Sequence, residues 1–152
     1  MLLKELEKTI MPHLGKASKL SAMYMIYKFK EHKVNLTREQ FILLAMLHEQ
    51  DGQPQNNLAL FTEKNKASLT RLINTMEKKE LVVRIPSKAD KRINYIHLTK
   101  HGRKVFKATG PILKEMTKEV EKGLTKEEIQ KVIVIMNKVM TNIKNSQPIV
   151  ND

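Results

Sequence analysis

Apolar side chains recur at the spacing of an α-helix through most of this chain. One segment places apolar residues at positions i, i+3, i+4 and i+7, namely Leu69, Leu72, Ile73 and Met76. Residues at this spacing share one face of a helix. Only five glycines and five prolines interrupt such patterns in 152 residues. Because 41% of the residues are hydrophobic, the chain can also bury a core, and we expect a mostly helical folded protein.

Cap residues indicate where the helices begin. Thr37 and Gln40 form a T-x-x-Q capping box, and residues 51–54 end the helix behind it. Asn65 is expected to cap the helix that carries Leu69. Before residue 37, we expect a helix over residues 5–32, with a break or a frayed first turn at Pro12 and Gly15. After residue 54, we expect a short helix capped by Asn56 or Asn57.

Two short runs rich in β-branched residues follow. Residues 81–86 (LVVRIP) and 93–98 (INYIHL) are typical of the strands of a hairpin. The tip between them, residues 87–92 (SKADKR), is polar and basic and lacks apolar anchors. The sequence therefore predicts a mostly α fold with a small β-hairpin wing that projects into solvent behind two short helices, which is a winged helix-turn-helix.

The C-terminal third is predicted to form two long helices. The first runs from Thr99 to about Lys122, with a kink at residues 110–111 because proline removes a backbone donor. A second capping box, from Thr125 to Glu128, starts the other helix, whose apolar side chains occupy two faces. A chain of this size offers few neighbours for the second face, so we expect a partner subunit to cover it.

Positive charge is concentrated in the middle of the chain. Residues 62–107 contain 13 basic and 4 acidic side chains, a net charge of +9 out of +12 for the whole chain. Such a field attracts phosphate backbones or anionic membranes. A solvated lysine-rich face is the alternative, but the charge coincides with the predicted short helices and wing. This coincidence favours double-stranded DNA as the partner.

Several function classes lack the residues they require. The chain has no cysteine, its five histidines are scattered, and no motif places a nucleophile beside a base or forms a phosphate-binding glycine loop. We therefore expect no enzyme activity, no cofactor and no metal. The longest apolar run, residues 132–136, is far too short to span a membrane, and the N-terminus lacks a signal-peptide core. The expected location is the cytoplasm.

The helix face opposite Leu69 carries groups suited to reading bases. At 100° per residue, that face presents a small residue, a guanidinium, an amide and an ammonium, flanked by two hydroxyls: Ala67, Arg71, Asn74, Lys78, Thr70 and Thr75. Such donors and acceptors recognise base edges in a major groove. An ordinary amphipathic surface helix is the alternative, and the adjacent basic wing disfavours it.

Taken in order, these motifs resemble the MarR family of winged-helix transcription regulators. The resemblance rests on residues 36–41 (LTREQF), 58–59 (LA), 68–73 (SLTRLI), 77–84 (EKKELVVR), 90–92 (DKR) and 98–102 (LTKHG). It implies a triangular homodimer that binds a pseudo-palindromic operator, and often a small aromatic anion as effector. One departure is Glu80, because the family commonly has glycine there to supply a left-handed backbone conformation without steric cost. Glu80 therefore implies either a different exit from the helix or some backbone strain.

The resemblance implies a division of the chain and a function. Residues 1–35 and 100–145 would form an intertwined helical dimerisation region, residues 36–99 the DNA-binding region, and residues 146–152 a flexible tail. The predicted function is sequence-specific transcriptional regulation, as a ligand-responsive repressor. A non-specific architectural DNA-binding protein or a protein-binding winged helix is the alternative.

The candidate DNA-binding residues fall into two groups. On the recognition helix and just before it, we expect base contacts from Ser68, Thr70, Arg71 and Asn74 and phosphate contacts from Lys64, Lys66 and Lys78. At the wing, we expect Arg92 in the minor groove with its guanidinium held by Asp90, and phosphate contacts from Arg84, Lys88 and Lys91.

Overall fold

The computed structural model describes the backbone of residues 2–62 and 65–146 and the side chains of residues 4–59 and 65–146. The predicted tail, apart from residue 146, and the candidate Lys64 lie outside the described residues. The elements in chain order are α1 (Leu2–Leu6), α2 (Ile10–Glu31), α3 (Arg38–Glu49), β1 (Gln53–Pro54), α4 (Gln55–Thr62), α5 (Lys66–Lys78), β2 (Val82–Pro86), β3 (Asn94–Leu98), α6 (Lys100–Val120) and α7 (Lys126–Ser146).

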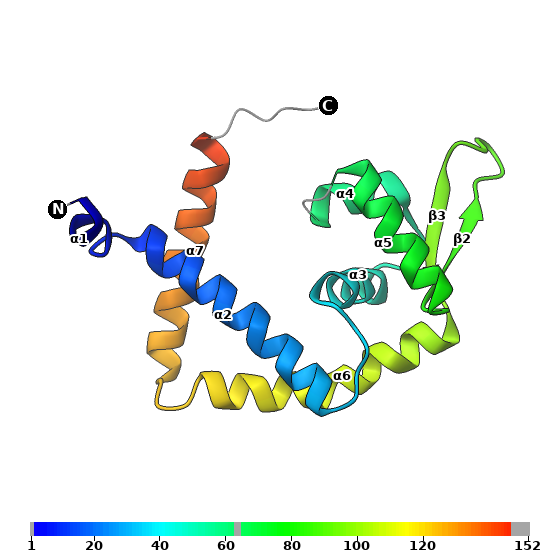
Figure 1. Ribbon diagram of the computed structural model, residues 1–152. Coiled ribbons are helices and arrows are strands. Elements are labelled where there is room, and N and C mark those ends of the chain that lie inside the picture. The colour runs from blue at the N-terminus through cyan, green and yellow to red at the C-terminus, as the bar shows by residue number, and fades with distance from the viewer. Residues whose placement is uncertain (1, 63–64, 147–152) are drawn as a thin grey trace. The chain divides into compact units, whose positions relative to one another are not determined.

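The chain divides into two compact units, Met1–Lys114 and Glu115–Asp152, with the boundary inside α6. The mostly helical prediction with a small hairpin is confirmed. In the first unit, the hairpin of β2 and β3 extends beyond α4 and α5 (Figure 1). Among the described residues, no helix is both long and apolar enough to cross a membrane.

Of the two alternatives at Pro12 and Gly15, the break is wrong, because the helix is interrupted at residues 7–9 and Pro12 lies in the first turn of α2. Pro12 is the third residue of α2, where backbone amides have no acceptor within the helix. Proline therefore costs no hydrogen bond at that position. Gly15 continues the helix, and no atom lies within 4 Å of where a Cβ would stand.

The α3 capping box is confirmed. The amide of Gln40 donates to Thr37 Oγ1 and the amide of Thr37 donates to Gln40 Oε1, each at 3.2 Å. The predicted start of the next helix is wrong, since α4 begins at Gln55 and includes both Asn56 and Asn57. The two residues before α4 form strand β1, which pairs with β3. The backbone is therefore extended up to Pro54, and the helix starts at the next residue.

The sheet has three antiparallel strands in the order β1-β3-β2. The hairpin register pairs Val82 with Leu98 and Pro86 with Asn94, which confirms the predicted strands. One face of the sheet buries Val82, Ile96 and Leu98 against the helices. Strand β1 was not predicted, because two residues carry no periodic pattern.

The core of the first unit joins α2, α3 and α6 to the helices of the winged region. Phe41 lies between two other rings, edge-on to Phe29 at 5.6 Å and stacked on Phe106 at 5.9 Å between centroids. Phe29 is fully buried, as are Leu43, Leu44, Leu47, Leu58, Leu69, Ile73, Met76 and Ile96. Each contributes about 1.5–3 kcal/mol by leaving water.

The start of α6 packs directly on the backbone before β2. Thr99 caps the helix, since its Oγ1 accepts the amide of Gly102 at 2.9 Å. A Cβ on Gly102 would stand 2.0 Å from the carbonyl oxygen of Leu81, so only glycine permits this approach. The L-T-x-x-G motif thus has a structural role: its threonine caps α6, and its glycine lets α6 pack closely against the base of the hairpin.

The second unit consists of the end of α6 and the whole of α7. The predicted capping box is confirmed, with the amide of Glu128 donating to Thr125 Oγ1 at 3.2 Å. The Thr125 amide and hydroxyl donate to the Glu128 carboxylate and lower its pKa. None of the residues of α7 is buried, and its apolar side chains are exposed on more than one face.

Candidate nucleic-acid interface

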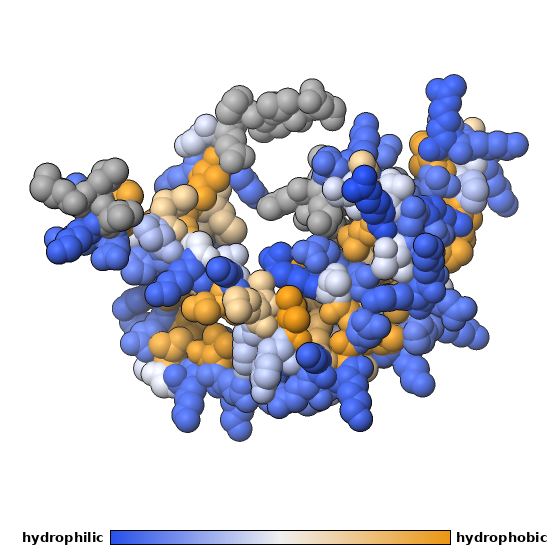
Figure 2. All heavy atoms as spheres, in the orientation of Figure 1, coloured by the Kyte–Doolittle hydropathy of each residue, from blue (hydrophilic) through white to orange (hydrophobic). Residues whose placement is uncertain are grey.

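Helix α5 presents its polar face to solvent. Asn65 caps it, because its Oδ1 accepts the amide of Ser68 at 2.8 Å, as predicted. The apolar stripe is buried at three of its four positions and the opposite side chains are exposed, namely Ala67, Arg71, Asn74 and Lys78. Hydrophilic side chains predominate over α4, α5 and the hairpin tip in Figure 2. The burial pattern therefore leaves the predicted base-reading face accessible.

The threonines of α5 have less hydrogen-bonding capacity than the sequence suggests. The hydroxyl of Thr70 donates to the Lys66 carbonyl at 2.8 Å and accepts from Gln55 Nε2 at 3.1 Å. The hydroxyl of Thr75 likewise donates to the carbonyl of Arg71 at 3.0 Å. With its donor occupied, Thr70 offers a base mainly its methyl group, which suits a thymine methyl.

Arg71 and Asn74 retain their full polar capacity. Both are exposed, and among the described residues neither side chain makes a hydrogen bond or an ion pair within the protein. A guanidinium and an amide are the groups that bind guanine and adenine in bidentate fashion. These two side chains therefore have the strongest chemistry for direct base recognition on this helix.

The wing tip is a hydrogen-bonded turn with exposed cations. Ser87 Oγ accepts the amides of Ala89 and Asp90 at 3.2 and 3.3 Å, and Asp90 Oδ1 accepts the amide of Arg92 at 2.9 Å. Asp90 thus bonds to the backbone of Arg92, whereas the predicted contact is with the guanidinium of Arg92. The side chains of Lys88, Lys91 and Arg92 are exposed, as a nucleic-acid contact requires.

Arg84 differs from the other wing cations because it is engaged within the protein. It lies in β2, and its guanidinium forms an ion pair with Glu77 of α5 and donates from Nε to Gln55 Oε1 at 3.0 Å. Only 20% of its side chain is exposed. No sequence pattern predicts this contact, because it joins residues on three separate elements.

A second polar cluster ties the base of the wing to the end of α3. Asp51 accepts the Leu98 amide at 2.8 Å, pairs with the Arg103 guanidinium and lies 3.8 Å from His97 Nδ1. Burial raises the pKa of the Asp51 carboxyl. The Leu98 and Gly52 amides together with the charges of Arg103 and His97 outweigh that effect, so the pKa is lowered overall. Sequence reasoning missed this cluster as well.

Glu80 adopts the backbone conformation that glycine would supply. Its φ is +55°, in the left-handed region. The amide of Leu81 donates to the carbonyl of Met76 at 2.9 Å and that of Glu80 to the carbonyl of Glu77 at 2.8 Å. These two bonds form a Schellman motif that ends α5. Of the two alternatives, a different exit from the helix or a strained backbone, the first is not found, because the helix exit keeps its usual geometry with Glu80 in the left-handed region.

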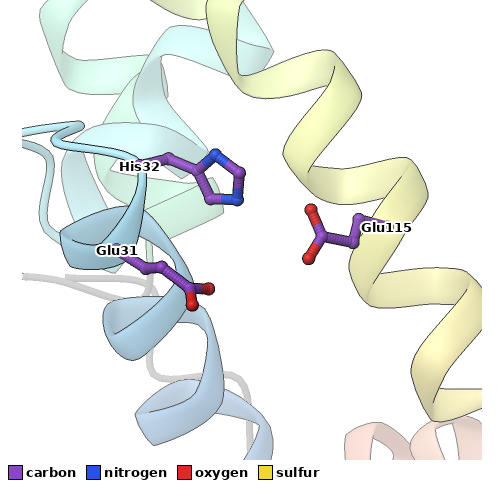
Figure 3. Close-up of side chains that lie close together, drawn as sticks. All are labelled: Glu31, His32 and Glu115. Atoms are coloured by element: carbon purple, nitrogen blue, oxygen red, sulfur yellow. The ribbon is translucent and has the colours of Figure 1, made fainter.

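The C-terminal part of α2 carries charged residues close to an aromatic side chain. The Lys28 ammonium pairs with Glu31 at 3.5 Å and lies 5.8 Å from the centroid of the Tyr24 ring. Figure 3 shows Glu31 and His32 at this helix end. Glu115, also drawn, lies on α6 in the second unit.

The arrangement of α3, α4 and α5 with the sheet and its projecting hairpin defines a winged helix-turn-helix protein. The sequence profile of the MarR family matches residues 36–93. The chain is 30% identical over 106 residues to the transcriptional regulator HosA of Escherichia coli O127:H6, covering 70% of this chain and 78% of HosA. The chain belongs to the MarR family of transcriptional regulators.

Two further similarities bear on function. The homoprotocatechuate degradative operon repressor of Escherichia coli is 30% identical over 98 residues, covering 64% of this chain and 66% of the repressor. MepR of S. aureus, solved as a complex with DNA, is 26% identical and superimposes with a TM-score of 0.77, covering 89% of this chain and 98% of MepR. The relatives are named as regulators, not as enzymes.

Proposed function

We propose that this protein binds a pseudo-palindromic operator as a homodimer and represses transcription until a small anionic effector releases it. One observation carries the DNA-binding part. The exposed face of α5, with Arg71 and Asn74 unengaged, lies beside a projecting basic hairpin in the segment of net charge +9. MepR, which has the same fold, is known in complex with DNA.

In the proposed complex, α5 enters the major groove and the wing reaches the adjacent minor groove. Base contacts come from Arg71 and Asn74 together with Ser68 and the methyl group of Thr70. Lys66 and Lys78 lie at the two ends of α5 and contact phosphates. At the wing, Arg92 enters the minor groove and Lys88 and Lys91 contact phosphates.

A second copy of the chain is the proposed cover for two apolar surfaces. Helix α2 exposes Leu20, Met23, Ile26 and Tyr27, and α7 exposes Val132, Ile133, Val134, Ile135, Met140 and Ile143. Soluble proteins bury apolar surface of this extent in an interface. Both helices fall in the predicted dimerisation region, residues 1–35 and 100–145. A two-fold dimer would hold its recognition helices about 34 Å apart, one turn of DNA.

The effector part of the proposal is supported by a cavity in the first unit. Its volume is about 510 Å³, a size that suits a small organic ligand. Four basic side chains line it, His32, Lys33, Lys79 and His101, together with apolar side chains. This lining favours a ligand that combines a carboxylate with an apolar body, and an effector of this type acts only through unequal affinity for the two states of the protein.

Selection of bound DNA from genomic fragments identifies the operator, and titration of that DNA with the protein measures how tightly the operator is bound. The DNA retained by the protein should contain an inverted repeat, and the protein should bind this DNA more tightly than random DNA at every salt concentration. Arg92→Ala should lose most operator affinity while sedimentation still shows a dimer. Equal binding to all fragments with a steep salt dependence would instead favour the non-specific architectural alternative.

A further inference from the structure

The last turn of α5 and the middle of β2 are joined by a two-point contact. The Arg84 amide donates to Glu77 Oε1 at 3.1 Å, and the Arg84 guanidinium pairs with Oε2 of the same carboxylate. Both carboxylate oxygens are therefore occupied by one residue of the wing. The side chains are 20% and 32% exposed, so water screens the pair less than it screens a surface ion pair.

The same guanidinium reaches the other half of the helix-turn-helix. Arg84 Nε donates to Gln55 Oε1 at 3.0 Å, and Arg84 Nη2 donates to the Thr70 carbonyl at 3.4 Å. Gln55 in turn donates from Nε2 to the Thr70 hydroxyl at 3.1 Å. Arg84 thus connects β2 to the first residue of α4 and to two turns of α5, at residues 70 and 77.

We propose that Glu77 and Arg84 are positioning residues that hold the wing at a fixed angle to the recognition helix. We call the contact between these two side chains the brace. Arg84 then supports DNA binding through the brace and not by contacting a DNA phosphate. The inference rests on the proposed DNA-binding function. If the helix and the hairpin are already held at the angle that the DNA requires, they can enter two neighbouring grooves without a further loss of conformational entropy. With the brace removed, the same contacts remain available, but part of their free energy is spent on ordering the wing.

The two roles of Arg84 predict opposite effects for Glu77→Gln. If Arg84 contacted a phosphate, removing the carboxylate would release it and would also remove a negative charge near the DNA, so binding would tighten. If the brace positions the wing, binding should weaken by roughly tenfold, because a charge-assisted contact is lost. The matched control is Glu80→Gln, which makes the same charge change three residues away, where the side chain is exposed.

A double-mutant cycle with Arg84→Gln separates the roles further. As a brace, either single substitution and the double substitution should weaken operator binding to a similar extent, with an unchanged salt slope. As a phosphate contact, Arg84→Gln should reduce the slope by about 0.9, independently of Glu77. Thermal unfolding of each variant shows whether it is folded. Tighter operator binding by Glu77→Gln, or additive effects with a reduced slope, would overturn the inference.

A measurement without DNA keeps the inference separate from the proposed function. Amide hydrogen exchange in Glu77→Gln should be faster at residues 82–85 than in the wild type and in Glu80→Gln, while the core of α3 stays protected. Unchanged exchange at the hairpin would refute the brace, even if the wild type binds an operator. If the wild-type protein selected no preferred DNA fragment, the proposed function would be refuted. The hydrogen-exchange result would still decide whether Glu77 and Arg84 hold the wing in place.

Discussion

Substituting Gly102 by alanine tests the close approach of α6 to the base of the hairpin. The added Cβ would stand 2.0 Å from the Leu81 oxygen and 2.9 Å from its carbonyl carbon, and both are backbone atoms that cannot rotate away. Leu81 is 2% exposed, and its carbonyl accepts from the Thr99 amide and hydroxyl at 3.2 and 3.3 Å. Relieving the clash must therefore shift packed elements and weaken those bonds.

The expected loss of stability is about 3–5 kcal/mol, from overpacking at about 1–3 kcal/mol and weakened hydrogen bonds at about 1 kcal/mol each. For a chain of this length, a loss of that size lowers the melting temperature by roughly 10 °C or more. The assay is thermal unfolding followed by circular dichroism at a fixed protein concentration.

Gly15→Ala in α2 is the control, since outside its own helix backbone and its chain neighbours no atom lies within 4 Å of its Cβ position, and no proline follows it. It should leave the stability unchanged or raise it by up to about 1 kcal/mol through helix propensity. A Gly102→Ala protein that melts together with the wild type would refute the argument that backbone contact requires glycine there.

Three further predictions follow from single residues. Glu80→Gly should stabilise the protein by about 0.5–1 kcal/mol in urea unfolding, because glycine adopts the +55° φ without steric strain, and a loss would contradict the strain. The lowered pKa of Asp51 makes its contribution to stability present above its ordinary pKa of 3.8 and lost as the pH falls through the folded value. Asp51→Asn should therefore be less stable than the wild type at pH 7, with the gap closing in acid, and a gap that is constant with pH would count against it. Arg71→Ala should cost about 1–3 kcal/mol of operator binding and relax the preference at one base pair, while Lys88→Ala should weaken all DNA sequences alike. Identical selectivity profiles for these two variants would rule out the division between base reading and phosphate contact.

Local rules predicted most of the elements. The capping boxes at Thr37 and Thr125 and the cap at Asn65 stand where their side chains satisfy helix amides, an interaction complete within four residues. The apolar period of α5 also settled which side chains are exposed. The same locality explains the error at Pro12, because proline breaks a helix only beyond its first turn.

Contacts between distant residues could not be predicted. The Glu77–Arg84 pair and the Asp51 cluster join separate elements, and each residue in them is unremarkable in its own neighbourhood. Sequence reasoning therefore grouped Arg84 with Lys88 and Lys91 as a wing cation, although it alone of the three is half-buried. For a basic residue in a β-strand next to a projecting loop, the neighbouring sequence does not show whether its side chain forms an internal ion pair or contacts DNA.

The unengaged state of Arg71 and Asn74 has a consequence for how this regulator changes over time. Since neither side chain supports the fold, replacements at these two positions leave the buried stripe beneath them intact. If Arg71 and Asn74 read bases as proposed, target choice and structural integrity are subject to separate selection. A lineage could acquire new binding sites on its chromosome by exchanging two surface groups, without compensating changes elsewhere in the molecule.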